Sequence, residues 1–315
     1  MPRRLKVLTW HVHGNYLYYL AHAPHDFHIV TKPCNPPGYA GLGGALRWPD
    51  NLHEVPYQQV AEHQFDCVLY QHLQHYLHDR LELLSAAQRA LPAVYLEHDP
   101  PQQHPTNTLH PAQDRQLLLV HVTPFNALMW DHGVTPWCVV EHGVTVPADV
   151  SYRGELARGI SVVNHLVRRG RRLGADVFEQ VRTQVPLDLV GMGTQEAGGL
   201  GEIQNPELPA FIARYRLFFN PIRYTSLGLA VIEAMLVGLP VVALATTEMA
   251  LLIQNGRNGY ADTRIPVLID VMQNLLRDAG LAREWGQQAR RDAAARFGIQ
   301  RFAHDWDQVL QRVAG

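Results

Sequence analysis

Short apolar runs alternate with helix-like segments throughout the first half of the chain. The runs have the length and composition of buried strands, and they cover residues 5–10, 27–30, 66–71, 93–97 and 116–122. Apolar spacing typical of helices follows at residues 16–23, at the segment containing Leu77, Leu81 and Leu84, and at residues 124–131. Strands that alternate with helices are typical of a parallel, doubly wound sheet, so the pattern predicts an α/β domain.

The second half repeats this alternation after a polar interruption. Strand-like runs cover residues 159–164, 187–190, 217–220 and 241–244, and helical segments cover residues 175–184, 206–215, 227–237, 265–296 and 300–313. The polar stretch 146–158 breaks the alternation, so we expect the interdomain linker there. The pattern predicts two domains, at residues 1–147 and 148–298, and a C-terminal helix at 299–315 that packs back towards the first domain.

A long segment in the first domain, residues 31–50, is rich in glycine and proline. Loops of this length inside domains are usually functional, although a flexible surface loop has the same composition. The run Gly41-Leu42-Gly43-Gly44 is no dinucleotide-binding fingerprint, because it lacks the spacing and does not lie between a strand and a helix.

The clearest candidate chemistry lies in the second domain, where a helix is predicted to open at Ser226, Leu227 and Gly228. A helix N-terminus presents free backbone N–H groups and a positive dipole end, which together suit phosphate oxygens. Glu233 follows on the same apolar helix, about a turn and a half further in. Its carboxylate is suited to accept hydrogen bonds from a pair of hydroxyls, although an ordinary helix carboxylate with a protein partner is the alternative.

Two further features of the second domain are candidates for contact with phosphate or nucleotide. Arg168, Arg169, Arg171 and Arg172 form the densest charge in the chain, and a guanidinium grips phosphate with two parallel N–H donors. A solvated helix face is the alternative for this run. The sequence Gly191-Met192-Gly193 follows a predicted strand, and it is either a tight turn or a loop that faces a nucleotide.

Composition narrows the class of protein. The chain has 315 residues, a formal net charge of -2 and a pI near 6.8, so no global basic field favours nucleic acid as a partner. Its three cysteines are widely spaced and form neither a disulfide framework nor a zinc ribbon, which favours a reducing compartment. No run approaches the roughly 20 apolar residues of a transmembrane helix. We therefore expect a cytoplasmic protein without a transmembrane segment.

The 18 histidines do not by themselves indicate a metal. His72, His75 and His78 are spaced by three on a predicted helix, where we expect a solvated stripe and keep metal binding as the alternative. His11 and His13 would make a zinc pair that lacks an obvious third ligand. Neither a His-Glu-x2-His motif nor paired cysteine spacing occurs, so no metal site is predicted.

The block that begins at Gly228 resembles the retaining glycosyltransferases of the GT-B fold (glycosyl transferases group 1), which use nucleotide-sugar donors. The residues that match this family's pattern are Gly228, Leu229, Glu233, Ala234, Met235, Gly238, Pro240, Val241 and Val242. The segment 140–144 is similar to the family's Ile-Pro-Asn-Gly-Val, and Ile253, Gly256 and Gly259 are similar to its Ile-x2-Gly-x2-Gly. The resemblance implies two Rossmann-like, doubly wound domains that face a cleft, with the acceptor in the first and the donor in the second.

On the donor side, the resemblance assigns Glu233 to the ribose diol and the backbone of Ser226, Leu227 and Gly228 to the pyrophosphate. Arg169 with the glycine after it stands for the family's Lys-Gly, and any of the neighbouring arginines can supply the same charge. The residues implied to bind the donor are Arg168, Arg169, Arg172, Gly191, Gly193, Thr225, Ser226, Leu227, Gly228 and Glu233. Thr225 departs from the family, because a second glutamate is expected there, and Thr246-Thr247 replaces its Gly-Gly.

On the acceptor side, the resemblance points to the loops of the first domain. His98 follows a strand at the expected site edge and is implied to face the sugar, with Asp99 beside it. His11, His13 and Gly14 lie in the loop after the first strand, where acceptor or donor sugar is expected. The expected catalytic residues are His98, Arg169 and Glu233.

The expected function is a retaining transfer of a sugar from a UDP- or GDP-sugar to a glycan, lipid or small-molecule acceptor, in polysaccharide biosynthesis. Positioning and stabilisation of the leaving diphosphate are expected to drive catalysis, with no tightly bound cofactor, no required metal and no protein nucleophile. Peripheral contact with a membrane remains open, as does the oligomeric state.

Two other functions remain open. A nucleotide-sugar-binding protein with reduced or no transferase activity is one alternative, and Thr225 favours it. A GT-B epimerase or phosphorylase-like enzyme is the other. A phosphorylase that uses pyridoxal phosphate needs a committed lysine, and the chain contains only Lys6 and Lys32, neither of them in the second domain.

Overall fold

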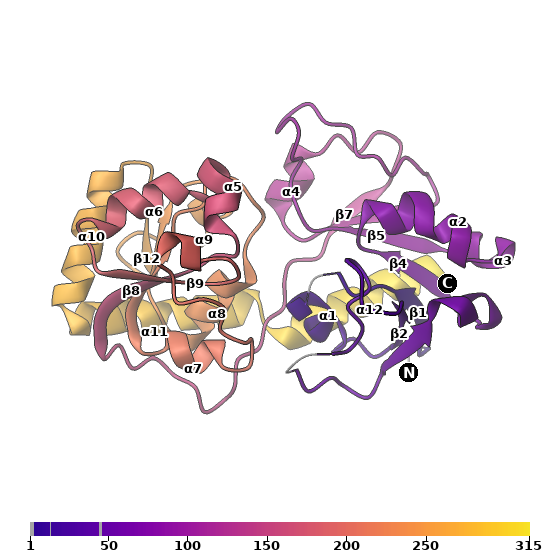
Figure 1. The fold of residues 1–315 in the computed structure, drawn as a ribbon, viewed down its shortest axis with the longest axis horizontal. Helices are drawn as coiled ribbons and strands as arrows, with labels where there is room; N and C mark the ends of the chain where they lie inside the picture. Colours follow the sequence, from indigo (N-terminus) through magenta and orange to yellow (C-terminus); the bar gives the residue numbers. More distant parts are fainter. Residues whose placement is uncertain (1–2, 13, 44–45) are drawn as a thin grey trace. The chain divides into compact units, whose positions relative to one another are not determined.

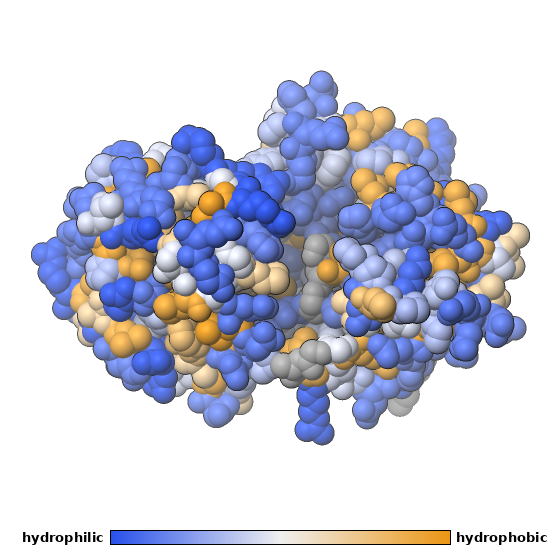
Figure 2. All heavy atoms as spheres, in the orientation of Figure 1, coloured by the Kyte–Doolittle hydropathy of each residue, from blue (hydrophilic) through white to orange (hydrophobic). Residues whose placement is uncertain are grey.

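The computed structural model describes residues 3–12, 14–43 and 46–315, and the chain divides into two units. Unit 1 comprises Met1–Gly143 and Ile299–Gly315, and unit 2 comprises Val144–Gly298 (Figure 1). The last helix of the chain thus belongs to the first unit. Polar residues cover most of the face seen in Figure 2, and apolar residues are scattered among them.

Unit 1 is built on a seven-stranded parallel sheet with the order β3-β2-β1-β4-β5-β6-β7. Its strands are β1 (Lys6–Thr9), β2 (Asp26–Thr31), β3 (Leu52–Pro56), β4 (Cys67–Tyr70), β5 (Ala93–Glu97), β6 (Leu117–His121) and β7 (Trp137–Val139). The chain adds strands on one side of β1 and then reverses to the other side at β4. The switch point of this sheet therefore lies between β1 and β4, where ligands of doubly wound sheets usually bind.

Short helices connect these strands. They are α1 (Gly14–Leu20), the 3-10 helix η1 (Tyr57–Glu62), the π-helix η2 (His75–Asp79), α2 (Arg80–Leu83), α3 (Ala86–Arg89) and α4 (Pro124–Met129), and the C-terminal helix α12 (Ile299–Ala314) completes the unit. Helix α12 packs on α1, and its buried Trp306 donates a hydrogen bond from Nε1 to the hydroxyl of Tyr16 at 3.1 Å. Phe302 packs edge-on to the same tyrosine.

The helix predicted around Leu77, Leu81 and Leu84 is present over residues 73–83, but it is not a continuous α-helix and it ends before Leu84. The segment is a π-helical turn followed by the four-residue α2, and Leu84 is already extended. Leu77 and Leu81 are exposed rather than packed, at 39% and 60%. The leucine spacing therefore marks no continuous core-facing helix.

The solvated histidine stripe is wrong at its central member. His75 is buried, and its ring stacks on Trp10 with 4.8 Å between centroids. The π-helical turn has a wider hydrogen-bond spacing than an α-helix, so residues three apart no longer share one solvent face. Burial lowers the pKa of His75 to about 4.

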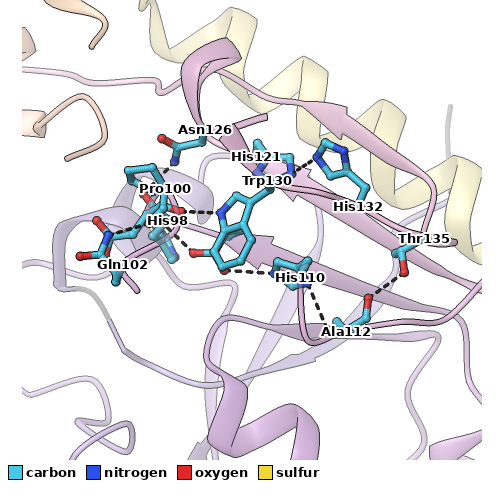
Figure 3. Close-up of polar contacts among 12 residues, drawn as sticks. His98, Pro100, Gln102, His110, Ala112, His121, Asn126, Trp130, His132 and Thr135 are labelled. Carbon is cyan, nitrogen blue, oxygen red and sulfur yellow. Dashed lines mark hydrogen bonds and ion pairs between the residues drawn. The ribbon is translucent and has the colours of Figure 1, made fainter. Parts of the chain in front are cut away.

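Buried histidines account for part of the high histidine content. The described residues include six of them, all in unit 1: His11, His25, His75, His110, His121 and His142. His110 lies 3.2 Å from the carboxylate of Glu97, and Nε2 of His121 lies 2.9 Å from Nε2 of His132 (Figure 3). Six histidines of this unit are therefore part of its core, and His110 and His121 pair there with neighbouring polar groups.

Unit 2 is built on a five-stranded parallel sheet with the order β12-β11-β10-β8-β9. Its strands are β8 (Leu156–Val162), β9 (Leu187–Val190), β10 (Tyr215–Asn220), β11 (Val241–Leu244) and β12 (Gly259–Asp262). The switch point lies between β8 and β10. The linker expected at 146–158 ends earlier than predicted, because β8 begins at Leu156 and this residue pairs with Tyr215 of β10.

Helices cover both faces of this sheet. The helices are α5 (Leu166–Leu173), α6 (Ala175–Arg182), α7 (Leu208–Ile212), α8 (Leu229–Val237), α9 (Met249–Leu252), α10 (Ile265–Arg277) and α11 (Ala279–Arg296), with the 3-10 turn η3 (Gln195–Ala197). α5, α6 and α10 lie on one face, and α7, α8 and α11 lie on the other (Figure 1). Within the described part of the chain, no helix combines the length and apolar character needed to span a bilayer.

Candidate functional site

The loops at the carboxyl edge of the unit 2 sheet form the candidate site. All five strands are parallel, so the loops that follow β8, β9, β10 and β11 emerge at the same edge. The loops after β8 and β10 flank the switch point, where open α/β sheets usually bind ligands. The predicted donor-binding residues lie in these loops or in the helices that follow them.

Helix α8 begins directly after the predicted phosphate-binding residues. Gly228 is its N-cap residue, with extended backbone (φ -72°, ψ 135°) and no side-chain cap. Gly228 is exposed and a Cβ placed on it would meet nothing within 4 Å, whereas Ser226 and Leu227 are buried. The uncapped helix start is therefore open to a phosphate group at Gly228.

Glu233 is buried in α8, with only 2% of its surface exposed. The amide of Asn205, in the loop before α7, reaches its Oε1 at 3.5 Å. A carboxylate buried in a helix of otherwise apolar side chains needs hydrogen-bond donors nearby. Asn205 was not predicted, because no local pattern links the two positions.

The arginine run lies on α5, which is kinked at Gly170 (φ 55°, ψ -137°). Arg168 and Arg171 are exposed, whereas Arg169 and Arg172 are half-buried. The carbonyl of Arg172 accepts the backbone N–H groups of Arg223 and Tyr224, at 3.0 and 3.2 Å. These two bonds attach the end of the arginine run to the loop that precedes α8.

An ion-pair network reinforces this attachment. Arg223 grips the carboxylate of Asp176 with two N–H groups at 2.5 and 2.7 Å, and Arg171 reaches the same carboxylate at 2.6 Å. The hydrogen bonds from Arg223 lower the pKa of Asp176, and those bonds raise the pKa of Arg223. The side chain of Arg171 is thus engaged with protein, while the backbone of Arg172 is bonded to the loop that leads to α8. Sequence reasoning missed Arg223 and Asp176, although Arg223 follows a predicted strand.

Gly191 and Gly193 form a tight turn that packs against the loop after β8. A Cβ on Gly191 (φ 136°) would lie 2.7 Å from the carbonyl oxygen of Val163, and one on Gly193 (φ 64°) would lie 2.7 Å from Nδ1 of His165. The N–H of Met192 donates to Oδ1 of Asn164 at 2.9 Å. The turn therefore requires glycine and joins two loops at the carboxyl edge.

Three threonines, Thr225, Thr246 and Thr247, replace the family's residues in this region. Thr225 is half-buried in the loop between β10 and α8. Thr246 donates its hydroxyl hydrogen to the carbonyl of Ile222 at 2.9 Å, which ties the loop after β11 to the loop after β10. Thr247 beside it has a positive φ of 50°. The loops after β8, β9, β10 and β11 are thus mutually supported.

In unit 1, His98 is connected to the switch point of its own sheet. Its Nε2 lies 3.2 Å from Oε1 of Gln71, whose amide group donates to the Thr9 hydroxyl and the Trp10 carbonyl at 3.1 and 2.9 Å. Gln71 follows β4 and Trp10 follows β1, the two strands that flank the switch point. Gln71 was not predicted as a site residue, and its position at the end of a predicted strand is the signal that marks it.

The backbone around His98 and Asp99 is held by α4 and the residue after it. The amide of Asn126 donates to the carbonyl of His98 at 3.1 Å, and the indole N–H of Trp130 donates to the carbonyl of Asp99 at 2.9 Å (Figure 3). His98 and Asp99 are both half-buried. Both side chains therefore stand on a fixed segment at the carboxyl end of β5.

The other predicted residues of unit 1 lie near its first loop. His11 is buried, and its Nδ1 contacts the carbonyl oxygen of Gly41 in the long loop. Gly14 is the first residue of α1, and His13 lies outside the described residues. The alternative of a zinc pair at His11 and His13 falls partly outside the described residues, and nowhere among the described side chains do three or more His, Cys, Asp or Glu gather as a metal site.

Comparisons with known proteins bear on both units. A family model described as glycosyl transferases group 1 matches residues 162–278, which include every predicted donor-binding residue. A search of curated protein sequences gave no match.

Several solved structures match nearly the whole chain at low identity. Sucrose-phosphate synthase from Thermosynechococcus elongatus matches with a TM-score of 0.69 and 15% identity, over 98% of this chain and 99% of that one. HepE from Anabaena, in complex with UDP and glucose, matches with a TM-score of 0.67 and 15% identity, over 98% and 100%. AviGT4, a glycosyltransferase involved in avilamycin A biosynthesis, matches with a TM-score of 0.65 and 15% identity, over 98% of both chains.

The resemblance inferred from the sequence and the predicted fold class are both confirmed. Residues 162–278 match the family model of glycosyl transferases group 1, and the chain as a whole has the two-sheet GT-B fold seen in these solved structures.

Proposed function

We propose that this protein is a retaining glycosyltransferase that moves a sugar from a nucleotide-sugar donor to a glycan, lipid or small-molecule acceptor. One observation carries the proposal. The open start of α8, the buried carboxylate of Glu233 and the arginine-bearing α5 meet at the switch point of one parallel sheet. One edge of unit 2 therefore offers a helix start and arginines for the phosphates of a nucleotide, and a carboxylate for its ribose.

The donor roles follow from the chemistry of each group. The backbone at Ser226, Leu227 and Gly228 would hold the diphosphate, because uncapped N–H groups and the helix dipole favour an anion. Glu233 would accept hydrogen bonds from the ribose hydroxyls. Arg169, with Arg168 and Arg172, would neutralise the diphosphate as it leaves, while the turn at residues 191–193 would border the nucleotide.

A UDP-sugar is the donor we favour. HepE, which shares the fold, has been solved with UDP and with UDP-glucose. A GDP-sugar would use the same ribose and phosphate contacts, so it belongs in the same test. We propose no tightly bound cofactor and no required metal, because the arginines and the helix start can balance the diphosphate charge.

His98 is proposed to contact the transferred sugar. Gln71 orients its imidazole through Nε2 at 3.2 Å, and the backbone around it is fixed by Asn126. An oriented side chain contributes to catalysis mainly by positioning the reacting groups. His11, Gly14 and Asp99 are proposed on the acceptor side. Attack from the face of the leaving diphosphate, without a protein nucleophile, would account for retention.

We also propose a cytoplasmic protein that acts in polysaccharide biosynthesis. Cys34, Cys67 and Cys138 are free thiols, which suits a reducing compartment. Peripheral contact with a membrane is compatible with a lipid acceptor.

A second candidate is a nucleotide-sugar-binding protein with little or no transfer activity. Thr225 favours it, because the hydroxyl there carries no charge where the resemblance calls for a carboxylate. Both candidates require the same nucleotide contacts, so only turnover separates them.

The experiment is a panel of UDP- and GDP-sugars in which binding and release of nucleoside diphosphate are both measured. We expect release with at least one donor. We also expect Glu233→Gln to weaken UDP binding by about 10- to 100-fold, since a hydrogen bond to a charged group contributes about 1.5–3 kcal/mol. Arg169→Ala should slow the release of nucleoside diphosphate more than it weakens binding of the nucleotide sugar.

Glu284→Gln and Arg290→Ala are matched controls, because both residues are exposed on α11. Binding without release for all donors and acceptor extracts would favour the second candidate. UDP binding that is unchanged in the Glu233→Gln protein would refute the donor site itself.

A further inference from the structure

A cavity of about 620 Å³ opens in unit 1 at the carboxyl ends of β2 and β3. Thr31 and Pro56, the last residues of the two strands, line it together with parts of the loop that connects them. β2 and β3 lie on the side of β1 away from the switch point. The cavity is therefore separate from His98 and Gln71, and none of the described site residues predicted from the sequence lines it.

Backbone strain is concentrated in the wall of this cavity. In the described ranges, four residues other than glycine have a positive φ: Cys34 (64°), Asn35 (44°), His165 (54°) and Thr247 (50°). All four lie in loops that leave the carboxyl edge of a sheet, and the last two belong to the candidate donor loops of unit 2. Strained residues persist where the surrounding structure fixes them, and they cluster at ligand sites. The adjacent pair at Cys34 and Asn35 marks the corresponding loop of unit 1.

The cavity contains one cation whose hydrogen-bond donors are uncommitted. The ammonium of Lys32 lies 4.2 Å from the ring centroid of Tyr39 and 5.8 Å from that of Tyr57. Across the part of the chain that the structure describes, no carboxylate lies within ion-pair distance of Lys32. A cation–π contact holds the ammonium group over the ring face. Its N–H groups that point away from the ring can still donate to a ligand. Lys32 is therefore oriented and still able to bind an anion.

The carboxylate in the cavity, Glu54, already has a structural task. Its Oε1 accepts the backbone N–H of Leu42 at 2.7 Å, and a Cβ on Gly41 would lie 2.7 Å from the same oxygen. The ring of His11 holds the loop at the carbonyl of Gly41 as well. Glu54 thus positions the loop that walls the cavity, and Lys32 is the cationic side chain that lies close enough to the cavity to pair with an anionic ligand.

We propose that this cavity binds an acidic sugar, that is, a polyhydroxylated ring with a carboxylate or phosphate substituent. The anionic substituent would pair with Lys32, whose compact charge suits either group. Thr31, Asn35 and Gln58 line the same cavity, and hydroxyl and amide groups such as theirs can bond ring hydroxyls. The statement that this sugar is the acceptor rests on the proposed function. The statement that the cavity binds it does not.

The exposed thiol of Cys34 can be used to detect binding of a ligand in this cavity. Cys34 lines the cavity and is exposed, whereas Cys67 is buried and Cys138 is half-buried. Burial raises the pKa of Cys67 to about 12, and burial raises the pKa of Cys138 as well. Iodoacetamide at mildly alkaline pH should therefore modify Cys34 first. A ligand in the cavity should slow this reaction.

The experiment measures the alkylation rate of Cys34 in the full chain against increasing concentrations of glucuronate, glucose 6-phosphate, glucose and inorganic phosphate. We expect the two acidic sugars to protect at concentrations about tenfold lower than glucose, because hydrogen bonds to a charged group are stronger than neutral ones. Inorganic phosphate should protect less well than glucose 6-phosphate. Equal protection by glucose and the acidic sugars, or by phosphate and glucose 6-phosphate, would refute the proposal.

Lys32→Gln is the decisive variant, and Lys6→Gln is its matched control because Lys6 is the only other lysine. In the Lys32→Gln protein we expect the tenfold preference to disappear while protection by glucose is unchanged. In the Lys6→Gln protein the preference should remain. A preference that survives Lys32→Gln would overturn the assignment. None of these measurements needs a nucleotide sugar or turnover, so failure of the transferase proposal would be recognised separately.

Discussion

Substituting alanine for Gly174 tests the close contact on which the candidate donor loop rests. Gly174 joins α5 to α6 in a left-handed conformation (φ 79°, ψ 31°). A Cβ at this position would come closer than 3.0 Å to the carbonyl oxygen of Pro221, the first residue of the loop between β10 and α8. Because the obstacle is backbone, it cannot be relieved by a side-chain rotation.

Two contributions make up the expected loss of stability. An L-residue in the left-handed conformation costs about 1–2 kcal/mol, and forcing an extra carbon into a packed site costs about 1–3 kcal/mol more. Gly174→Ala should therefore lower the free energy of unfolding of unit 2 by about 2–5 kcal/mol. Gly256→Ala is the matched control, because Gly256 has a similar φ of 75° and a Cβ there would meet nothing within 4 Å. Gly256→Ala should lower the free energy of unfolding only by the cost of the left-handed conformation, about 1–2 kcal/mol.

Hydrogen exchange of unit 2 amides is the suitable measurement, since a chain of two units need not unfold in one step. The Gly174→Ala protein should also bind UDP more weakly, because displacement of Pro221 moves the loop that ends at Gly228. Gly256→Ala should leave UDP binding unchanged. Equal losses of stability in the two variants would refute the close approach of Gly174 to Pro221.

Three other predictions address the loop anchor, the last helix and the buried histidines. Arg223→Met should weaken UDP binding in a calorimetric titration but change stability by about 1 kcal/mol or less, because its partner Asp176 is 39% exposed. Trp306→Ala should destabilise unit 1 by about 3–5 kcal/mol in hydrogen exchange and leave unit 2 unaffected, since the indole is fully buried against Tyr16. Burial lowers the pKa of His121 to about 3, so the unfolded chain takes up its proton below pH 6.5 while the folded chain does not. Stability of unit 1 should therefore fall as the pH drops from 6.5 towards 3, by up to about 2 kcal/mol from this group at pH 5, and His121→Gln should reduce that slope in urea titrations.

The buried strands and the apolar edge strand β9 could be predicted from the sequence, whereas the edge strands β3 and β12 could not. Strands such as β10 and β11 are covered on both faces, so they read as continuous apolar runs. β3 and β12 lie at the edges of their sheets and carry polar residues, as at His53 and Glu54 in β3. Apolar periodicity does not detect such strands, and their pairing with a neighbouring strand is what defines them.

Some residues of the candidate site could be found from local spacing along the chain, whereas others are brought together only by tertiary contacts. The start of α8 and Glu233 lie within one helix, so spacing along the chain was enough to find them. The pair of Arg223 and Asp176 connects positions 47 residues apart, and neither residue belongs to a motif. His75 was misplaced for another reason, because a π-helical turn cannot be distinguished from an α-helix by the spacing of apolar residues.

The nucleotide end and the sugar end of the proposed site depend on different kinds of group. The loops at the nucleotide end are held by backbone: the Arg172 carbonyl binds the N–H groups of Arg223 and Tyr224, and the glycine turn packs on the loop after β8. None of these contacts involves the side chain at Thr225. We therefore propose that a threonine in place of a carboxylate alters contact with the sugar, while the backbone groups proposed for the phosphates are kept in place by these other contacts. The transferase and the binding protein consequently share one nucleotide site, and they differ in whether a hydroxyl at position 225 suffices to hold the sugar for transfer.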